Sequence, residues 1–178
     1  MKKLPTREQA LQLLRDNQCS PKVIKHCKAV AELALETAEK CKENGLNVNL
    51  DLVEIGALLH DIGRSKTHSV HHAVVGAKIL TAACLPEPLI SIIKRHVGGG
   101  ITPCEAEQLG WPNDTYAPVA IEEKIVSYAD KLIAKAKRVP IEVTIAELAD
   151  EGRREAVERV LALHKEIAGY IGGYSWSH

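Results

Sequence analysis

The chain has 178 residues, enough to bury a hydrophobic core within one domain. Its 23 basic residues balance 23 acidic ones, which argues against nucleic acid or a membrane surface as a partner attracted by net charge. The apolar residues are mainly aliphatic and Phe is absent, a composition that favours packed helices over a β-sandwich.

Cysteine usage and hydropathy indicate where the protein works. An odd number of cysteines without Cys-x-x-Cys spacing predicts buried structural thiols in a reduced cytoplasm. These residues are Cys19, Cys27, Cys41, Cys84 and Cys104. No charged-then-apolar leader opens the chain, and no apolar stretch approaches the roughly 20 residues needed to span a bilayer. We therefore expect a soluble cytoplasmic protein without a membrane partner; the sequence does not determine its oligomeric state.

Residue patterns in the first half of the chain predict a series of helices. Thr6 and Gln9 have the spacing of a capping box that opens a short first helix. Ser20 as N-cap and Pro21 at the first helical position begin a second helix, and Gly45 offers its stop. Three more helices are expected over about residues 49–61, 68–84 and 87–96.

The second half is more broken but still helical. Residues 98–100 are three glycines, interpreted as a flexible lid or hinge because no strand precedes them to support a phosphate-binding turn. Thr102 caps a short helix that stops at Gly110, and Pro118 opens the helix that carries Asp130. Two helices follow, at about 141–150 and 153–170. We predict one all-α domain over residues 1–178, with its motifs in a core at about 20–135.

The dipeptide His60-Asp61 is the most informative feature of the chain. It ends an apolar run, residues 52–59, and is followed by Ile62, Gly63 and Arg64. A buried imidazole beside a buried carboxylate is costly unless something compensates, and a divalent cation would do so. Further candidate ligands occur along the chain, at His26, His72, His96 and Asp130. The pattern indicates a metallohydrolase.

Four segments then carry a family resemblance. Residues 53–64 resemble the HDIG signature of the HD superfamily of metal-dependent phosphohydrolases, and residues 72–80, 92–96 and 127–132 resemble its later ligand-bearing stretches. The similarity spans about residues 20–135. It implies an HD-type helical bundle in which a metal-activated water cleaves a phosphate ester or anhydride of a nucleotide or related small molecule. A small phosphorylated substrate is therefore the expected partner, and nucleic acid is not.

The resemblance also implies roles for individual residues. His26, His60, Asp61 and Asp130 would hold one ion, while His72 and His96 would supply a second, with Asp61 between the two. Nitrogen and oxygen donors without thiolate favour Mn, Fe, Co, Ni or Mg over a structural zinc. Asp61 and Arg64 are the expected catalytic residues, because a planar guanidinium binds phosphate in a bidentate manner.

The layout is most similar to compact binuclear forms, including HD-type diadenosine tetraphosphate hydrolases. It departs from the HD-GYP phosphodiesterases, since residues 98–101 read Gly-Gly-Gly-Ile after His96, which makes cyclic di-GMP a poor substrate. Two other functions stay open. One is a non-catalytic module that senses a nucleotide or serves RNA processing, and the other is a di-iron oxygenase-like HD protein.

Several residues allow a second interpretation. His68 or His71 could replace His72, and His96 could simply complement a helix dipole. Trp111 and Tyr116 could stack on a nucleobase, although anchoring of their loop is preferred. Three other groups are expected to face solvent. These are Lys131, the charged stretch 150–155, and the pair His164 and His178.

Overall fold

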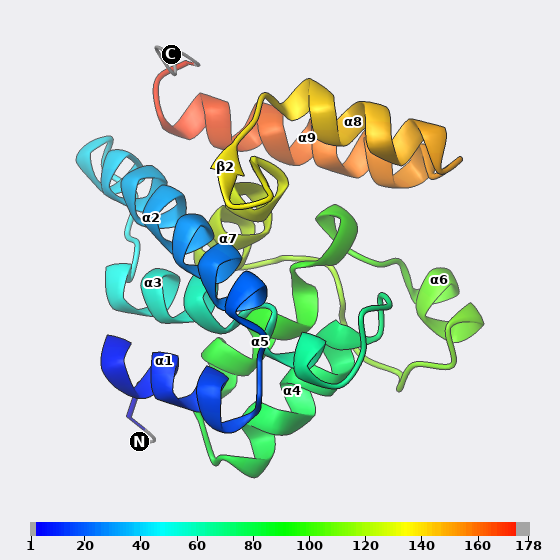
Figure 1. Ribbon diagram of the computed structural model, residues 1–178. Helices are drawn as coiled ribbons and strands as arrows, with labels where there is room; N and C mark the ends of the chain where they lie inside the picture. The colour runs from blue at the N-terminus through cyan, green and yellow to red at the C-terminus, as the bar shows by residue number, and fades with distance from the viewer. Residues whose placement is uncertain (1–2, 174–178) are drawn as a thin grey trace.

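The computed structural model describes residues 3–173 and confirms the all-α bundle (Figure 1). Its first half contains α1 (Arg7–Asp16), α2 (Pro21–Glu43), α3 (Leu50–Leu59), the 3₁₀ turn η1 (Ile62–Ser65), α4 (His72–Ala82) and α5 (Glu87–Arg95). Its second half contains the 3₁₀ turn η2 (Val97–Gly99), α6 (Pro103–Gln108), α7 (Ile121–Lys131), β1 (Ile133–Ala134), β2 (Lys137–Arg138), α8 (Ile141–Asp150) and α9 (Arg154–Tyr170).

The predicted helix starts at the N-terminus are correct. Thr6 and Gln9 exchange the two hydrogen bonds of a capping box, and the Ser20 hydroxyl accepts from the Val23 N–H. Other limits differ from the prediction. Helix α3 ends at Leu59, before the His-Asp pair, and α4 begins at His72 because residues 68–71 form turns.

A small antiparallel hairpin, β1–β2, was not predicted. Its two-residue turn consists of Lys135 and Ala136, both with positive φ, as a tight hairpin turn requires. Each strand has only two residues, too few to produce an alternating pattern in the sequence.

The main core forms around α3, which packs against α1, α2, α5 and α7. Most residues of α3 are buried, and α2 contributes a buried stripe that includes Val30, Ala34 and Ala38. Cys19, Cys27 and Cys41 are buried as expected, whereas Cys84 and Cys104 are exposed, so that part of the cysteine prediction is wrong. Within residues 3–173 no helix combines the length and the apolar character that crossing a membrane would demand.

A second, smaller core holds the segment between α5 and α7. Trp111 and Tyr116 are buried there with their ring centroids 4.8 Å apart, and Trp111 Nε1 donates to His71 Nδ1 at 2.8 Å. The aromatic rings therefore anchor this segment, as preferred from the sequence.

The glycine triplet is a packed turn and not the lid or hinge that the sequence suggested. A Cβ atom added to Gly99 would lie 3.2 Å from the Arg159 carbonyl carbon of α9, and one added to Gly100 would lie 3.0 Å from Ala117 Cα. All three glycines have positive φ, so they serve a tight reversal after α5.

Candidate metal centre

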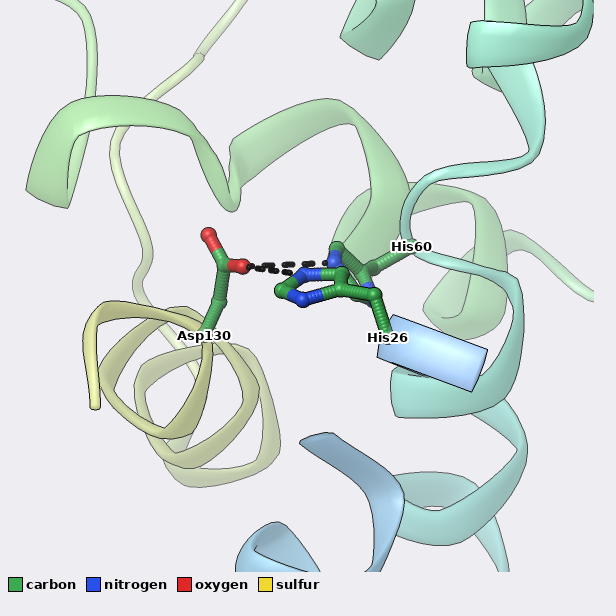
Figure 2. Close-up of side chains that lie close together, drawn as sticks. All are labelled: His26, His60 and Asp130. Carbon is green, nitrogen blue, oxygen red and sulfur yellow. Dashed lines mark hydrogen bonds and ion pairs between the residues drawn. The ribbon is translucent and has the colours of Figure 1, made fainter. Parts of the chain in front are cut away.

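One group of candidate ligands joins three helical segments. His26 comes from α2, His60 directly follows α3, and Asp130 comes from α7 (Figure 2). The Asp130 Oδ1 atom lies 3.0 Å from His26 Nε2 and 3.4 Å from His60 Nε2, so both rings point to the same carboxylate oxygen. Asp61 Oδ2 lies 3.9 Å from His26 Nε2 and 3.7 Å from His60 Nε2. The four residues expected to hold a first ion therefore converge.

A second group forms on the other oxygen of Asp61. Asp61 Oδ1 lies 3.1 Å from His72 Nε2 and 3.7 Å from His96 Nε2, and the two Nε2 atoms are 3.0 Å apart. Asp61 thus separates two clusters of imidazole nitrogens and offers one oxygen to each. His60, Asp61 and His96 also satisfy the spacing of a metal-binding group, with one donor atom from each lying within 4.8 Å of the others.

The three rings at His60, His72 and His96 share one local arrangement. Each Nδ1 atom lies 2.7 Å from the backbone carbonyl oxygen three residues earlier in the chain. A carbonyl oxygen only accepts hydrogen bonds, so each Nδ1 carries the proton and each Nε2 presents a lone pair to the cluster. Histidines that bind metals are commonly held in this way by a carbonyl or carboxylate on the other ring nitrogen.

The donor set fits a cation. Buried His60 Nε2 and Asp61 Oδ1 have no hydrogen-bond partner in the described part of the chain, although such groups are costly to leave unpaired. With Nδ1 protonated on both rings, His72 and His96 also direct lone pairs at each other across 3.0 Å. Repulsion between these lone pairs is relieved by positive charge at this place, which a divalent ion would provide.

The ionisation of the two carboxylates also favours a cation at this place. Burial by itself disfavours ionisation of Asp61, but its interactions with His60, His72 and His96 outweigh that effect and hold the pKa of Asp61 well below its usual range. Burial also opposes ionisation of Asp130, and Lys131 is the main group that overcomes it and keeps its pKa low. Both carboxylates therefore remain charged at neutral pH.

The pKa values of the buried histidines His96 and His60 are shifted in opposite directions. Burial lowers the pKa of His96 to about 4, so its imidazole is neutral and able to act as a ligand. Burial also acts to lower the pKa of His60, but the charges of Asp61 and Asp130 outweigh it and raise that pKa. The two carboxylates thus stabilise a positive charge at His60 Nε2, which either a proton or a metal cation can supply.

Two glycines bring α4 against η1 and so place His72. A Cβ atom on Gly63 would lie 2.0 Å from the His72 carbonyl oxygen and 2.7 Å from the Gly76 nitrogen. One on Gly76 would lie 2.8 Å from Ile93 Cγ2. Only glycine allows this close approach, which holds the first turn of α4 beside Asp61. Of the two alternatives to His72, His71 accepts a hydrogen bond from Trp111, and His68 lines the same cleft as His72.

Two cations contact the candidate ligands. Arg64 Nε donates to Asp61 Oδ2 at 2.6 Å and Arg64 Nη1 to the His68 carbonyl at 3.2 Å. Lys131 Nζ lies 2.5 Å from Asp130 Oδ2. The expectation that Lys131 faces solvent is wrong, because its long stem folds back over the neighbouring carboxylate and leaves the side chain only 14% exposed.

The candidate ligands open onto a cleft of about 340 Å³. Its wall includes Glu147, Glu151 and Arg153, none of which was expected at the site, so the stretch 150–155 is not simply a solvated face. Ser127 was also missed, and its hydroxyl donates to the His96 carbonyl at 2.9 Å, which fixes the turn that presents this ring. His164 is half-buried, with Nδ1 3.0 Å from Tyr128 Oη, and His178 lies outside the described residues.

Comparison with known proteins places these features in a family. The HD domain family matches residues 23–135. The chain is 46% identical to an uncharacterized protein of Methanocaldococcus jannaschii over 162 residues, covering 90% of this chain and 95% of that protein. It is 40% identical to a tRNA (cytidine(56)-2'-O)-methyltransferase of Thermoplasma volcanium over 172 residues, covering 97% of this chain but 49% of the relative. The chain therefore spans about half the length of that methyltransferase.

A solved structure shares the fold. The HD domain of the L. monocytogenes phosphodiesterase PgpH superposes with a TM-score of 0.54 at 20% identity, covering 92% of this chain and 97% of that domain. That domain has also been solved in complex with cyclic-di-AMP. The sequence match, the fold and the clustered His and Asp side chains agree, and the chain belongs to the HD domain family.

Proposed function

We propose that this protein is a divalent-metal-dependent phosphohydrolase that cleaves a phosphate ester or anhydride of a nucleotide or a related small molecule. The observation that carries the proposal is the convergence of Nε2 lone pairs and carboxylate oxygens on Asp61, with buried His60 Nε2 and Asp61 Oδ1 lacking any protein partner among the described residues. Membership of the HD domain family supports the same chemistry.

In this proposal the ligands divide into two sets around Asp61. His26, His60, Asp61 and Asp130 would hold one ion, and His72, His96 and Asp61 would hold a second. Mn, Fe, Co, Ni and Mg suit imidazole nitrogen and carboxylate oxygen donors. A bound ion of this kind lowers the pKa of a coordinated water and polarises a phosphoryl oxygen.

The other side chains bind and orient the substrate. Arg64 uses Nε and Nη1 to hold Asp61 and the η1 turn, and its side chain is 31% exposed toward the cleft. Its remaining N–H groups can bind phosphoryl oxygens, where a guanidinium stabilises charge that builds up in the transition state. Lys131 places a second positive charge at the same mouth. Residues of α7 and η2 form one part of the cleft wall.

Three relatives and the size of the cleft bear on the substrate. The cyclic-di-AMP complex of the PgpH domain supports a nucleotide, and the cleft of about 340 Å³ is at the small end of the range of about 300–1,000 Å³ for small-molecule sites. The likeness to a tRNA methyltransferase, and to a ribonuclease Y of Pseudothermotoga lettingae at 30% identity over 120 residues, is a specific reason to test RNA as well.

The test combines metal analysis with a substrate panel. Metal-free protein is reloaded separately with Mn, Fe, Co, Ni and Mg, and bound metal is measured by plasma mass spectrometry. Each form is assayed on nucleoside monophosphates, diadenosine tetraphosphate, cyclic-di-AMP, tRNA and p-nitrophenyl phosphate. We expect hydrolysis that depends on the metal and is absent in an Asp61→Asn variant shown to be folded by circular dichroism.

A metal-loaded protein that hydrolyses none of these compounds would contradict the proposal. A mixed-valent di-iron signal accompanied by oxygen consumption would instead favour the oxygenase-like alternative. Tight nucleotide binding without turnover would favour a sensing module.

A further inference from the structure

The α8–α9 segment forms part of the cleft although it lies outside the residues that match the HD family. Four residues of α8 and its C-terminal turn contribute to the wall with helical spacing, and Arg153 joins them just before α9. The four are Thr144, Glu147, Leu148 and Glu151. Figure 1 shows α8 and α9 packed together over the end of α7, the helix that carries Asp130.

Arg153 is held directly against the turn that follows His96. A Cβ atom added to Gly98 would lie 3.3 Å from Arg153 Nη2, so the guanidinium packs on the backbone two residues beyond a candidate ligand. The Arg153 N–H donates to the Leu148 carbonyl at 2.9 Å, and Gly152 has a φ of +74°, which together fix the sharp turn between the helices. The position of Arg153 is therefore set by backbone contacts at both ends.

Arg153 differs from the other cations of the cleft in what it binds. Arg64 and Lys131 each contact the carboxylate of a candidate ligand, at 2.6 Å and 2.5 Å. Arg153 Nη1 lies 3.6 Å from Glu151 Oε2, beyond hydrogen-bond distance, and its guanidinium donates no hydrogen bond to any other group within residues 3–173. Its side chain is 39% exposed. Its N–H donors are thus free for an anion in the cleft.

The carboxylates of Glu147 and Glu151 restrict which ligands the cleft can accept beside a phosphoryl group. Glu147 and Glu151 are one helical turn apart, exposed, and part of the same wall. Carboxylates accept hydrogen bonds from hydroxyl or amino groups and repel additional phosphates. The wall therefore suits a ligand with one phosphoryl group near the candidate metals and an uncharged remainder rich in donors, as in a nucleoside.

We propose that the α8–α9 segment selects the substrate, with Arg153 binding a phosphoryl oxygen and Glu147 accepting a hydrogen bond from the nucleoside part. This inference rests on the proposed phosphohydrolase function. It predicts a preference for nucleoside monophosphates over nucleoside triphosphates, because the second and third phosphates would approach the carboxylates of Glu147 and Glu151.

The first experiment compares Arg153→Gln with Arg154→Gln in metal-loaded protein. Arg154 is the neighbouring arginine, is exposed and does not line the cleft, so it is a matched control. Calorimetry with inorganic phosphate should show binding weakened by about ten- to a hundred-fold in Arg153→Gln, the loss expected for one charge-assisted contact. Arg154→Gln should stay within about two-fold of the parent protein, and metal content should be unchanged in both. Equal binding by the two variants overturns the role of Arg153.

The second experiment tests Glu147. Glu147→Gln should lower kcat/KM for a nucleoside monophosphate, leave that for p-nitrophenyl phosphate unchanged, and improve binding of a nucleoside triphosphate. An equal effect on both monoesters overturns the assignment. Phosphate binding that depends on Arg153 in a protein that hydrolyses nothing would refute the proposed function while leaving this binding site in place, so the two failures are distinguishable.

Discussion

His72 and His96 face each other through their Nε2 atoms at 3.0 Å, although 24 residues separate them in the chain. Both rings donate from Nδ1 to a backbone carbonyl, so a neutral ring could donate to the other only by giving up that bond. The pair is arranged as ligands would be, and its geometry differs from that of an ordinary hydrogen-bonded couple.

This relationship leads to a prediction about the number of ions. Substitution of His72 or His96 by Ala should reduce bound Mn²⁺ from two equivalents toward one, because each removes a nitrogen donor from the same cluster. Activity should fall further than in an Arg64 variant, since two-metal sites act on both the attacking and the leaving oxygen. Metal content is measured by plasma mass spectrometry after gel filtration. Unchanged stoichiometry in both variants would leave these histidines with a different role, such as phosphate binding.

Metal binding should also stabilise the fold. An ion at 100 times its dissociation constant adds about 2.7 kcal/mol to the free energy of unfolding, which raises the melting temperature of metal-free protein. Asp61→Asn should lose most of this increase, because the substitution removes the charged group that lies between the two sets of donors. Differential scanning fluorimetry with and without Mn²⁺ gives both shifts. An increase of equal size in Asp61→Asn would place the stabilising ion elsewhere.

Arg64 should affect the reaction and not the ions. Arg64→Ala should retain bound metal and lower kcat/KM for a cleaved phosphate ester by one to two decades, since a charge-assisted contact contributes about 1.5–3 kcal/mol. Arg64→Lys should recover only part of the loss because ammonium cannot reproduce the planar fork. Steady-state kinetics on one metal-loaded batch make the comparison. A rate equal to that of the parent protein would remove Arg64 from the mechanism.

Gly63 should be intolerant of any side chain. Its Cβ would overlap backbone atoms of α4, including the His72 carbonyl oxygen at 2.0 Å. Overpacking typically lowers the free energy of unfolding by about 1–3 kcal/mol. Because this overlap is with backbone atoms, Gly63→Ala should lower it by about 3 kcal/mol. Urea unfolding measures the change. Gly169→Ala is the control, because Gly169 is a helical residue of α9 with open space around it, and it should gain about 0.5–1 kcal/mol. A similar effect at both positions would mean that the close approach of η1 and α4 is not required.

Much of the fold could be predicted because its signals are local. Capping residues at Thr6 and Ser20 and the spacing of apolar residues along α2 indicate helices without knowledge of what they pack against. The short β1–β2 hairpin could not be found in this way, since two residues per strand carry no periodicity.

The candidate site was predictable where sequence spacing reflects a packing constraint. His72 was expected among the ligands from the resemblance of residues 72–80, and the structure supplies a physical reason for that stretch, which is the contact of Gly76 with Gly63 and Ile93. The position of Arg153 depends on how α8 and α9 pack over α7, and no local pattern reports that arrangement. Lys131 was misjudged because the angle between adjacent residues on a helix describes Cβ directions and not the reach of a four-carbon stem.

The shared Nδ1 contacts of His60, His72 and His96 have a consequence for how the protein would take up the proposed ions. Each imidazole is oriented by the backbone of its own turn, so the rotamer entropy of these side chains is already lost when the chain folds. An ion that enters the cleft therefore meets donors that are aligned in advance. Uptake would then require little rearrangement, and we expect one divalent metal to exchange for another without partial unfolding of the bundle.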